Sequence, residues 1–132
     1  MNSDAQVYID RLKQELSCNR DVLAAFLLGS VVHGPFREDS DVDCALMLRD
    51  GCKIDPLDRL QLSGTLSGVV GRSVDLGIIS TDNLIYSMQT VSGGQLLFAH
   101  DTAAVEERTM YIYSLYTKLR EERFEVERAY EC

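Results

Sequence analysis

Two aspartates, Asp41 and Asp43, stand at the start of an apolar run, residues 42–48, that is typical of a buried strand. Because side chains alternate along a strand, both carboxylates should project from one face, roughly 7 Å apart. Two carboxylates on one sheet face repel each other and lose solvation unless a cation lies between them. Mg²⁺ prefers such oxygen ligands together with substrate phosphates. The pair therefore predicts a magnesium site.

A glycine and a serine, Gly29 and Ser30, end the preceding apolar run, residues 22–28, which also has the composition of a buried strand. A strand that turns at Gly-Ser into the start of a helix presents backbone N–H groups and a hydroxyl to a phosphate. Ten residues separate Ser30 from Asp41. One segment would then bind phosphate and the next would bind the metal, which predicts a nucleotide site.

A third acid, Asp75, is embedded in another strand-like apolar run, residues 73–79. An ionised side chain there stays unpaired unless its strand lies beside the one that carries Asp41 and Asp43. Phosphoryl transfer with two metals, about 3.5–4 Å apart, requires several shared carboxylates and an acid that accepts a proton. The three aspartates meet that requirement, so we expect them to gather at one site.

Each of these features also has a purely structural interpretation. The Gly29-Ser30 pair alone fits an ordinary strand-to-helix turn, and the aspartate pair alone fits a solvated edge strand. However, residues 44–48 are apolar on both faces of the second strand. A strand buried on both faces has no reason to carry two acids on one of them. Asp75, between apolar neighbours, is equally hard to explain alone, so the combination favours a functional role.

The pattern Gly-Ser-x10-Asp-x-Asp, followed about thirty residues later by Val-Asp-Leu, resembles that of the nucleotidyltransferase superfamily of DNA polymerase β. The small size is similar to that of the minimal nucleotidyltransferases (MNT), the antitoxin partners of HEPN-domain ribonuclease toxins. The resemblance covers roughly residues 5–120. It implies a polymerase β-like fold, two Mg²⁺ ions, and ATP as the donor. It also implies transfer of AMP to a tyrosine of the toxin, which is thereby silenced, in a hetero-oligomer with that toxin.

Carried over by position, the resemblance assigns a role to each motif residue. Gly29 and Ser30 would hold the nucleotide triphosphate. Asp41 and Asp43 would bind both metal ions. Asp75 would bind one metal and act as the general base toward the incoming hydroxyl. These roles are what the family pattern implies, and the spacing of the residues alone does not assign them.

The segment between the Gly-Ser pair and the acids departs from the family pattern. Many relatives carry Arg where this chain has His33, and a neutral histidine lacks the permanent charge and the bidentate phosphate contact of an arginine. Arg37, four residues on, could compensate. Ser40 would cap the turn before the second strand, or its hydroxyl would reach a phosphate. His33 would either contact the nucleotide or lie at the surface. None of these changes removes an acid.

The composition is that of one packed, acidic domain spanning residues 1–132. Hydrophobic residues make up 45% of the chain, which argues against disorder. The net charge is −8, with a pI near 4.6. Such a surface repels nucleic acid, whose binders neutralise phosphates with Lys and Arg, so we expect no direct nucleic-acid binding. An acidic surface suits a basic protein partner such as a ribonuclease.

The remaining composition indicates a cytoplasmic protein without structural zinc. The four cysteines show no C-x-x-C pairing and no histidine at zinc spacing. The N-terminus lacks a basic segment followed by an apolar one, so we expect no signal peptide. No apolar run approaches the 18 residues that a membrane span requires. Reduced thiols and a cytoplasmic location are the corresponding expectations.

The pattern along the chain predicts a small α/β domain with a mixed sheet flanked by helices. Asp55-Pro56 should start a helix whose apolar face includes Leu66, Val69 and Val70. Thr81-Asp82 should cap another helix, and residues 95–99 should form a short strand. A long last helix should follow, over about residues 101–128, with a charged far end in solvent.

Three functions from different classes remain open at this point. The first is a protein adenylyltransferase that acts as an antitoxin. The second is a small-molecule nucleotidyltransferase of the antibiotic-modifying kind, which usually requires an added substrate-binding domain. The third is a non-catalytic antitoxin that inhibits its partner by binding through the last helix. The intact set of acids favours a catalytic function.

Overall fold

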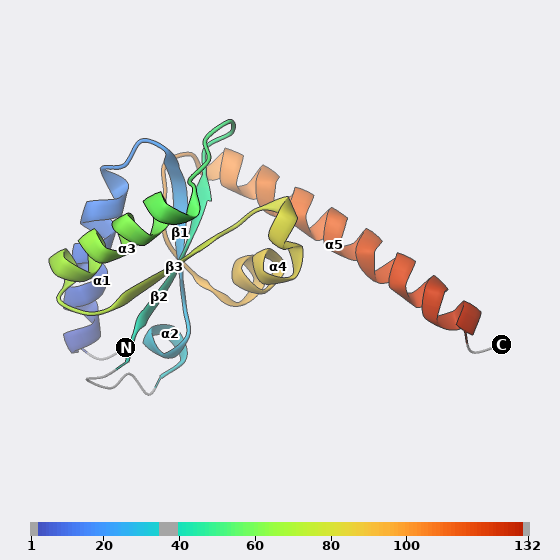
Figure 1. Ribbon diagram of the computed structural model, residues 1–132, viewed down its shortest axis with the longest axis horizontal. Coiled ribbons are helices and arrows are strands. Elements are labelled where there is room, and N and C mark those ends of the chain that lie inside the picture. The colour runs from blue at the N-terminus through green and yellow to red at the C-terminus, as the bar shows by residue number, and fades with distance from the viewer. Residues whose placement is uncertain (1–2, 35–39, 131–132) are drawn as a thin grey trace.

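The structure, a computed structural model, describes residues 3–34 and 40–130. In this part of the chain a four-stranded sheet is covered by helices on both faces (Figure 1). The elements are α1 (Ser3–Ser17), β1 (Val22–Leu28), α2 (Ser30–His33), β2 (Val42–Leu48), α3 (Pro56–Val70), β3 (Val74–Ile78), the 3₁₀ turn η1 (Thr81–Asn83), α4 (Leu84–Gly93), β4 (Gln95–Ala99) and α5 (Thr102–Tyr130). The expected α/β class is confirmed.

The sheet is mixed, as the sequence predicts. Its strand order is β3-β2-β1-β4, with β1 antiparallel to both β2 and β4, and β2 parallel to β3. Because β2 and β3 are parallel, their first residues lie side by side at one end of the sheet. This end also receives the last residues of β1, since β1 runs in the opposite direction.

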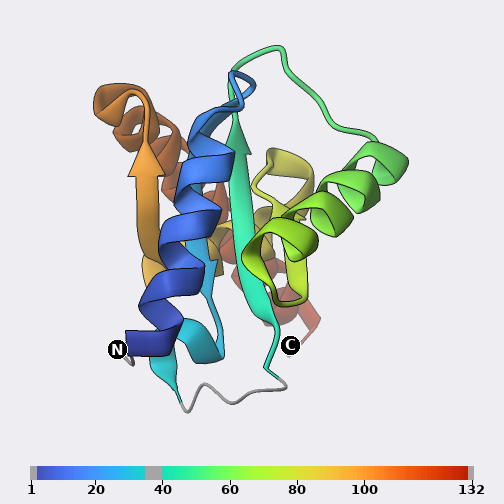
Figure 2. The ribbon, with the colours of Figure 1, turned by 90° about the vertical axis from the view of Figure 1, so that its left-hand side faces the viewer.

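Two apolar clusters pack against the two faces of the sheet. Helices α1 and α3 cover one face, and α4 and α5 cover the other (Figures 1 and 2). Along β2, Cys44 and Leu46 face α1 and α3, whereas Ala45 and Met47 face α4 and α5. This alternation confirms that β2 is buried on both faces. It also places Asp43 on the face covered by α4 and α5.

Helix α3 shields the outer edge of β3 with a row of polar side chains at four-residue spacing. Ser63 Oγ donates to the carbonyl of Val74, and Ser67 Oγ accepts from the backbone N–H of Val74 at 2.9 Å. One turn earlier, Arg59 Nη1 donates to the carbonyl of Leu76 at 3.5 Å. Backbone groups of an edge strand that would otherwise be open are therefore satisfied by the helix.

The start of α3 is confirmed, but its apolar face is narrower than expected. Asp55 Oδ1 accepts from the backbone N–H of Asp58 at 2.8 Å, which is an N-cap bond ahead of Pro56. Leu66 and Val70 are buried, as predicted. The expectation for Val69 is wrong, because 43% of its surface is exposed.

The start of α4 also differs from the sequence prediction. Residues 81–83 form a 3₁₀ turn, and no side chain makes a capping hydrogen bond at either helix start in this described segment. The buried hydroxyl of Ser87 instead binds Ser80, accepting from its N–H and donating to its carbonyl at 2.9 Å each. A side chain from inside the helix thus ties down the entry, which local capping rules do not anticipate.

Helix α5 runs from the sheet into solvent, as expected, and extends to Tyr130. Its start is capped by Asp101, whose Oδ1 accepts from the N–H of Ala104 at 3.1 Å. Val105 and Ile112 pack against the sheet, while residues 121–130 are exposed and project away from it (Figure 1). Within the ranges described, no helix is both long and apolar enough to cross a membrane.

Candidate active site

Two of the predicted acids lie side by side at one end of the sheet. Asp43 in β2 pairs in register with Asp75 in β3, and on its other side with Leu28 in β1. Asp75 alternates with the buried Val74 and Leu76 on its own strand, so its side chain shares the α4/α5 face with Asp43. The parallel pairing thus brings together two acids that are far apart in sequence.

The third acid, Asp41, directly precedes β2 and is exposed. Its charge nevertheless affects Asp43. The pKa of the Asp43 carboxyl is raised mainly by burial, and further by the charge of Asp75 and then by that of Asp41. Among the described residues, no group of three His, Cys, Asp or Glu side chains is placed to hold a metal ion. The gathering of all three acids around metal therefore stays a prediction.

The electrostatics of the paired acids fit a divalent cation. Within residues 3–34 and 40–130, no lysine or arginine forms an ion pair with Asp43 or Asp75. Burial of Asp43 is the main cause of the raised pKa of its carboxyl, and the negative charges of Asp75 and Asp41 raise it further. Mg²⁺ is commonly bound by one or two carboxylates and substrate phosphates, so this pair suits it.

Gly29 places the backbone of the phosphate-binding candidate directly against Asp43. Its φ of 70° lies in the left-handed region, at the point where β1 ends and the short helix α2 begins. A Cβ at this position would lie 2.6 Å from Oδ2 of Asp43. Glycine is therefore required both by the backbone angle and by the space that the carboxylate occupies.

We expect Gly29→Ala to lower the stability and to disturb Asp43 at the same time. The left-handed backbone alone should cost about 1–2 kcal/mol, and the Cβ would also displace the carboxylate. Thermal unfolding, followed by circular dichroism, measures the first effect. Gly51→Ala is the matched control, because Gly51 has φ 82° in open space, so its substitution carries the backbone cost alone. Equal losses of stability in the two variants would contradict the close approach.

The other predicted ligands are only partly described. Ser30 and His33 begin and end α2, which confirms the expected helical turn, and their side chains are not described. Arg37 lies outside the described residues. Ser40 is half-buried, and its carbonyl accepts a hydrogen bond from Arg72 Nη1 at 2.9 Å. Arg72 thus ties the segment before β2 to the turn between α3 and β3.

A cavity of about 460 Å³ opens beside the paired acids. It extends from the end of β1 across β2 and β3 to α4. Its lining consists of Leu28, Asp43, Cys44, Arg59, Asp75, Leu76, Gly77, Ile78, Asn83 and Tyr86. Sequence reasoning missed Arg59, Asn83 and Tyr86, because all three come from helices or turns outside the motif. The sequence contains one local indication of this cavity. Gly77 comes two residues after Asp75, so it is on the same face of β3 and leaves that face without a side chain there.

Tyr86 reaches from α4 over the bare backbone of Gly77. A Cβ on Gly77 would collide with the Tyr86 hydroxyl and would lie 2.5 Å from its Cζ. Burial raises the pKa of the Tyr86 phenol, and the charges of Asp75 and Asp43 also raise it, against a hydrogen bond from Thr90 that lowers it. The phenol is therefore protonated at neutral pH and can donate a hydrogen bond.

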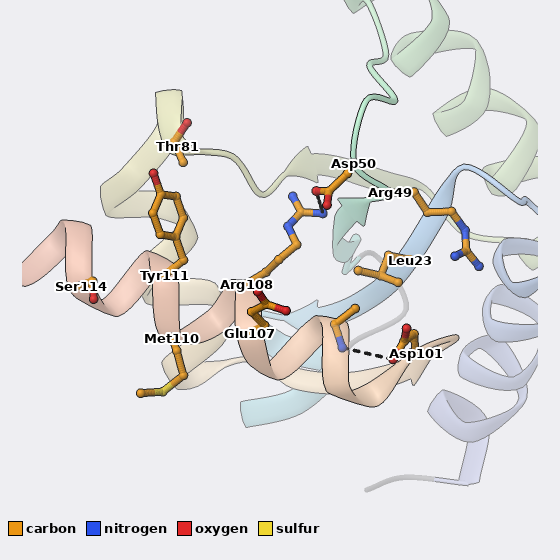
Figure 3. A pocket seen from close by; sticks show the side chains of 11 residues that line it. Leu23, Arg49, Asp50, Thr81, Asp101, Glu107, Arg108, Met110, Tyr111 and Ser114 are labelled. Carbon is orange, nitrogen blue, oxygen red and sulfur yellow. Dashed lines mark hydrogen bonds and ion pairs between the residues drawn. The ribbon is translucent and has the colours of Figure 1, made fainter.

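A larger cavity, of about 700 Å³, lies at the opposite end of the sheet (Figure 3). It is bounded by Leu23 near the start of β1, Asp50 after β2, and the first half of α5. Arg108 reaches from α5 to Asp50, with 3.8 Å between Nη1 and Oδ1, and also donates to the carbonyl of Leu48. Since the paired acids are at the other end of the strands, this cavity belongs to a different part of the molecule.

The family model of "Polymerase beta, Nucleotidyltransferase" matches residues 10–103. The match covers more than half of the chain and includes the Gly-Ser pair and all three acids. The chain belongs to the polymerase β nucleotidyltransferase family. It is accordingly a nucleotidyltransferase. No curated protein matches the chain in sequence.

Solved structures show that this nucleotidyltransferase shares its fold with chains of toxin–antitoxin complexes. One comes from a crystal structure of a toxin–antitoxin with AMP-PNP, at 22% identity, with 95% of this chain and 97% of that chain covered and a TM-score of 0.74. Another, from the toxin–antitoxin MntA-HepT, has 20% identity, 96% and 99% coverage, and a TM-score of 0.73.

A third similar chain comes from the tri-AMPylated Shewanella oneidensis HEPN toxin in complex with its MNT antitoxin. Its identity is 19%, with 97% of this chain and 99% of that chain covered, and its TM-score is 0.73. At these identities the similarity establishes the shared fold. The almost complete coverage of both chains shows that the fold match includes α5, which lies mostly beyond the family model.

Proposed function

We propose that this nucleotidyltransferase is a Mg²⁺-dependent protein adenylyltransferase that acts as an antitoxin in the cytoplasm. It would transfer AMP from ATP to a tyrosine of a HEPN ribonuclease toxin and so neutralise it. The observation that carries the proposal is the in-register pair of Asp43 and Asp75, with Gly29 packed against Asp43. The similar chains from complexes with a bound ATP analogue or an AMPylated toxin support it.

In this proposal all three acids bind metal, and Asp75 is also the general base. Asp43 and Asp41 hold the metal, and Asp75 completes the site from the neighbouring strand. Gly29 and the start of α2 offer backbone N–H groups to the triphosphate. Mg²⁺, when bound, neutralises the charge that develops on the phosphates. Because Asp43 is half-buried beside Asp75, and its pKa is raised by burial and by the neighbouring charges, its ionised form should gain most from a nearby cation.

The reaction is an in-line substitution at the α-phosphorus of ATP. The tyrosine oxygen forms a new bond to the α-phosphorus, and the bond from that phosphorus to the pyrophosphate oxygen breaks. Asp75 accepts the proton from the tyrosine hydroxyl, and pyrophosphate leaves with the electron pair of the broken bond. The products are an AMP-tyrosine ester and pyrophosphate, so atoms and charge balance without another reactant.

The proposal is tested by incubating this protein with Mg²⁺, ATP and the helical protein encoded by a neighbouring gene. We expect intact-mass spectrometry to show a gain of one or more AMP units on the partner, and its ribonuclease activity to fall. The Asp41→Ala/Asp43→Ala double variant should produce no gain. No mass gain with the intact protein would contradict the catalytic proposal.

The exposed end of α5 favours one other function, inhibition by binding alone. Phe124, Val126 and Tyr130 are exposed on this projecting helix and could contact a partner. A stable complex that silences the partner without a mass gain would support this candidate. Transfer of AMP to an aminoglycoside, without any partner protein, would instead indicate a small-molecule nucleotidyltransferase.

A further inference from the structure

The cavity beside the paired acids begins at Leu28, at the end of β1, and extends past Asp43 over β3 to α4. The Gly29 backbone is outside the cavity lining and meets Asp43 at the β1 end, so most of the cavity lies on the β3 side of Asp43. Asp75 and Gly77 are on the same face of β3, so the cavity floor beyond Asp75 is bare backbone. If the triphosphate lies over the Gly29 turn, this cavity is on the side from which a hydroxyl reaches Asp75.

Tyr86 from α4 occupies the place that a side chain at position 77 would take. Its hydroxyl and Cζ are the groups that a Cβ on Gly77 would strike. Residues two apart on a strand are roughly 7 Å apart. The phenol oxygen is therefore held over the strand position next to Asp75, inside the cavity that Asp75 lines.

We propose that the cavity between β3 and α4 is the acceptor subsite for a phenolic hydroxyl, and that Tyr86 is the residue that selects it. This inference rests on the proposed function and names the place and the chemistry of its acceptor. The Tyr86 hydroxyl donates a hydrogen bond to the acceptor oxygen, while the acceptor O–H points to the Asp75 carboxylate. Two fixed partners then orient one incoming oxygen.

The lining of the cavity suits a tyrosine side chain in size and in polarity. Leu28, Ile78 and the Tyr86 ring provide apolar surface, and the two acids, Arg59 and Asn83 provide polar atoms. A flat ring with one polar end matches such a mixture, and about 460 Å³ accommodates it. A purely apolar acceptor would leave the Asp75 carboxylate and the donor hydrogen of the Tyr86 hydroxyl without the acceptor's oxygen, which is a strong source of discrimination.

The test compares Tyr86→Phe with the wild-type protein in AMP transfer to the partner. Removing one hydroxyl should raise the acceptor KM or lower kcat/KM for the acceptor on the order of tenfold, with the KM for Mg-ATP and the melting temperature unchanged. Tyr113→Phe is the matched control, because Tyr113 is also half-buried but is on α5 and outside the cavity lining. A change in the KM for Mg-ATP alone would overturn the inference.

A pair of variants tests the placement of Tyr86 over Gly77. Gly77→Ala should lower the melting temperature, because its Cβ collides with the phenol. In the Tyr86→Ala background the same substitution should have little effect, since the colliding group is gone. Equal effects of Gly77→Ala in both backgrounds would show that the phenol does not lie over β3, which would overturn the inference.

A binding measurement separates this inference from the proposed function. Saturation-transfer NMR compares N-acetyl-tyrosinamide with N-acetyl-phenylalaninamide, in the presence of Mg²⁺ and a non-hydrolysable ATP analogue. Preference of the wild-type protein for the tyrosine amide, lost in Tyr86→Phe, supports the subsite even where AMP transfer is not observed. Absence of binding, or an equal preference in both proteins, overturns the subsite whatever the transfer assay shows.

Discussion

Asp43→Asn is expected to reduce AMP transfer by on the order of a thousandfold or more, and at the same time to raise the melting temperature. The loss of activity follows because the charge that would hold the metal is removed. The gain in stability follows because Asp43 is partly buried beside Asp75 and near Asp41, and all three factors disfavour its ionised form. A residue kept for function at the expense of stability is common at active sites.

The pH dependence of this effect has a definite sign. The pKa of Asp43 in the folded protein is raised above the ordinary value of 3.8. The folded protein therefore binds the proton of the Asp43 carboxyl more tightly than the unfolded chain does. The stabilisation that protonation of Asp43 gives is fully present below pH 3.8, and it is lost as the pH rises through the raised pKa. The stability difference between Asp43→Asn and wild type should be largest at neutral pH and shrink as the pH falls toward 3.8.

Thermal unfolding in EDTA, at neutral pH and near pH 4, measures this difference. Glu15→Gln is a matched control, because Glu15 is exposed on α1 and its substitution removes the same charge far from the paired acids. Addition of Mg²⁺ should raise the melting temperature of the wild-type protein and have little effect on Asp43→Asn. A melting temperature of Asp43→Asn below that of wild type at neutral pH would show that Asp43 is compensated by a cationic group.

Leu46→Ala is expected to cause the largest loss of stability of any single truncation considered. Leu46 is 0% exposed in the central strand β2, with Ala25 and Ile78 as its neighbours in register. Removing its buried methyl groups should cost about 2–5 kcal/mol, through lost burial and the cavity left behind. For a domain of this size that corresponds to a fall of about 10–20 °C in melting temperature.

Chemical and thermal unfolding of Leu46→Ala, followed by circular dichroism, test this expectation. Leu60→Ala is the matched control, because Leu60 on α3 is 69% exposed, and its substitution should change the free energy of unfolding by less than about 0.5 kcal/mol. Similar losses for both variants would mean that the outer face of α3 is covered in solution. A small loss for Leu46→Ala would contradict the burial of β2 on both faces.

The strands could be predicted from the sequence because their signals are local. The boundaries of β1, β2 and β4 agree with the expected runs. For β1 and β2 the reason is that a strand buried on both faces leaves a continuous apolar stretch. The Asp55 cap and the turn at Gly29 also depend on neighbouring residues alone. Asp43 and Asp75 were recognised because an acid inside an apolar run is costly without a partner.

The features that the sequence did not reveal depend on contacts between distant segments. Ser63 and Ser67 of α3 bind the edge of β3, and Ser87 replaces the expected cap of α4. Neither contact can be derived from helical periodicity, since both depend on which strand lies next to the helix. Arg59 and Tyr86 were missed at the site for the same reason.

The sequence by itself determined that three acids and a Gly-Ser pair lie in or beside apolar runs, and the tertiary structure decided how they are arranged. Residue types and spacing predict a phosphate and metal site there, because solvation and charge penalise such residues wherever they are buried. The parallel pairing of β2 with β3 decided that Asp43 and Asp75 face each other. The packing of α4 over Gly77 decided that a phenol lies beside them, because only the folded chain brings Tyr86 to a strand that its sequence position does not mark.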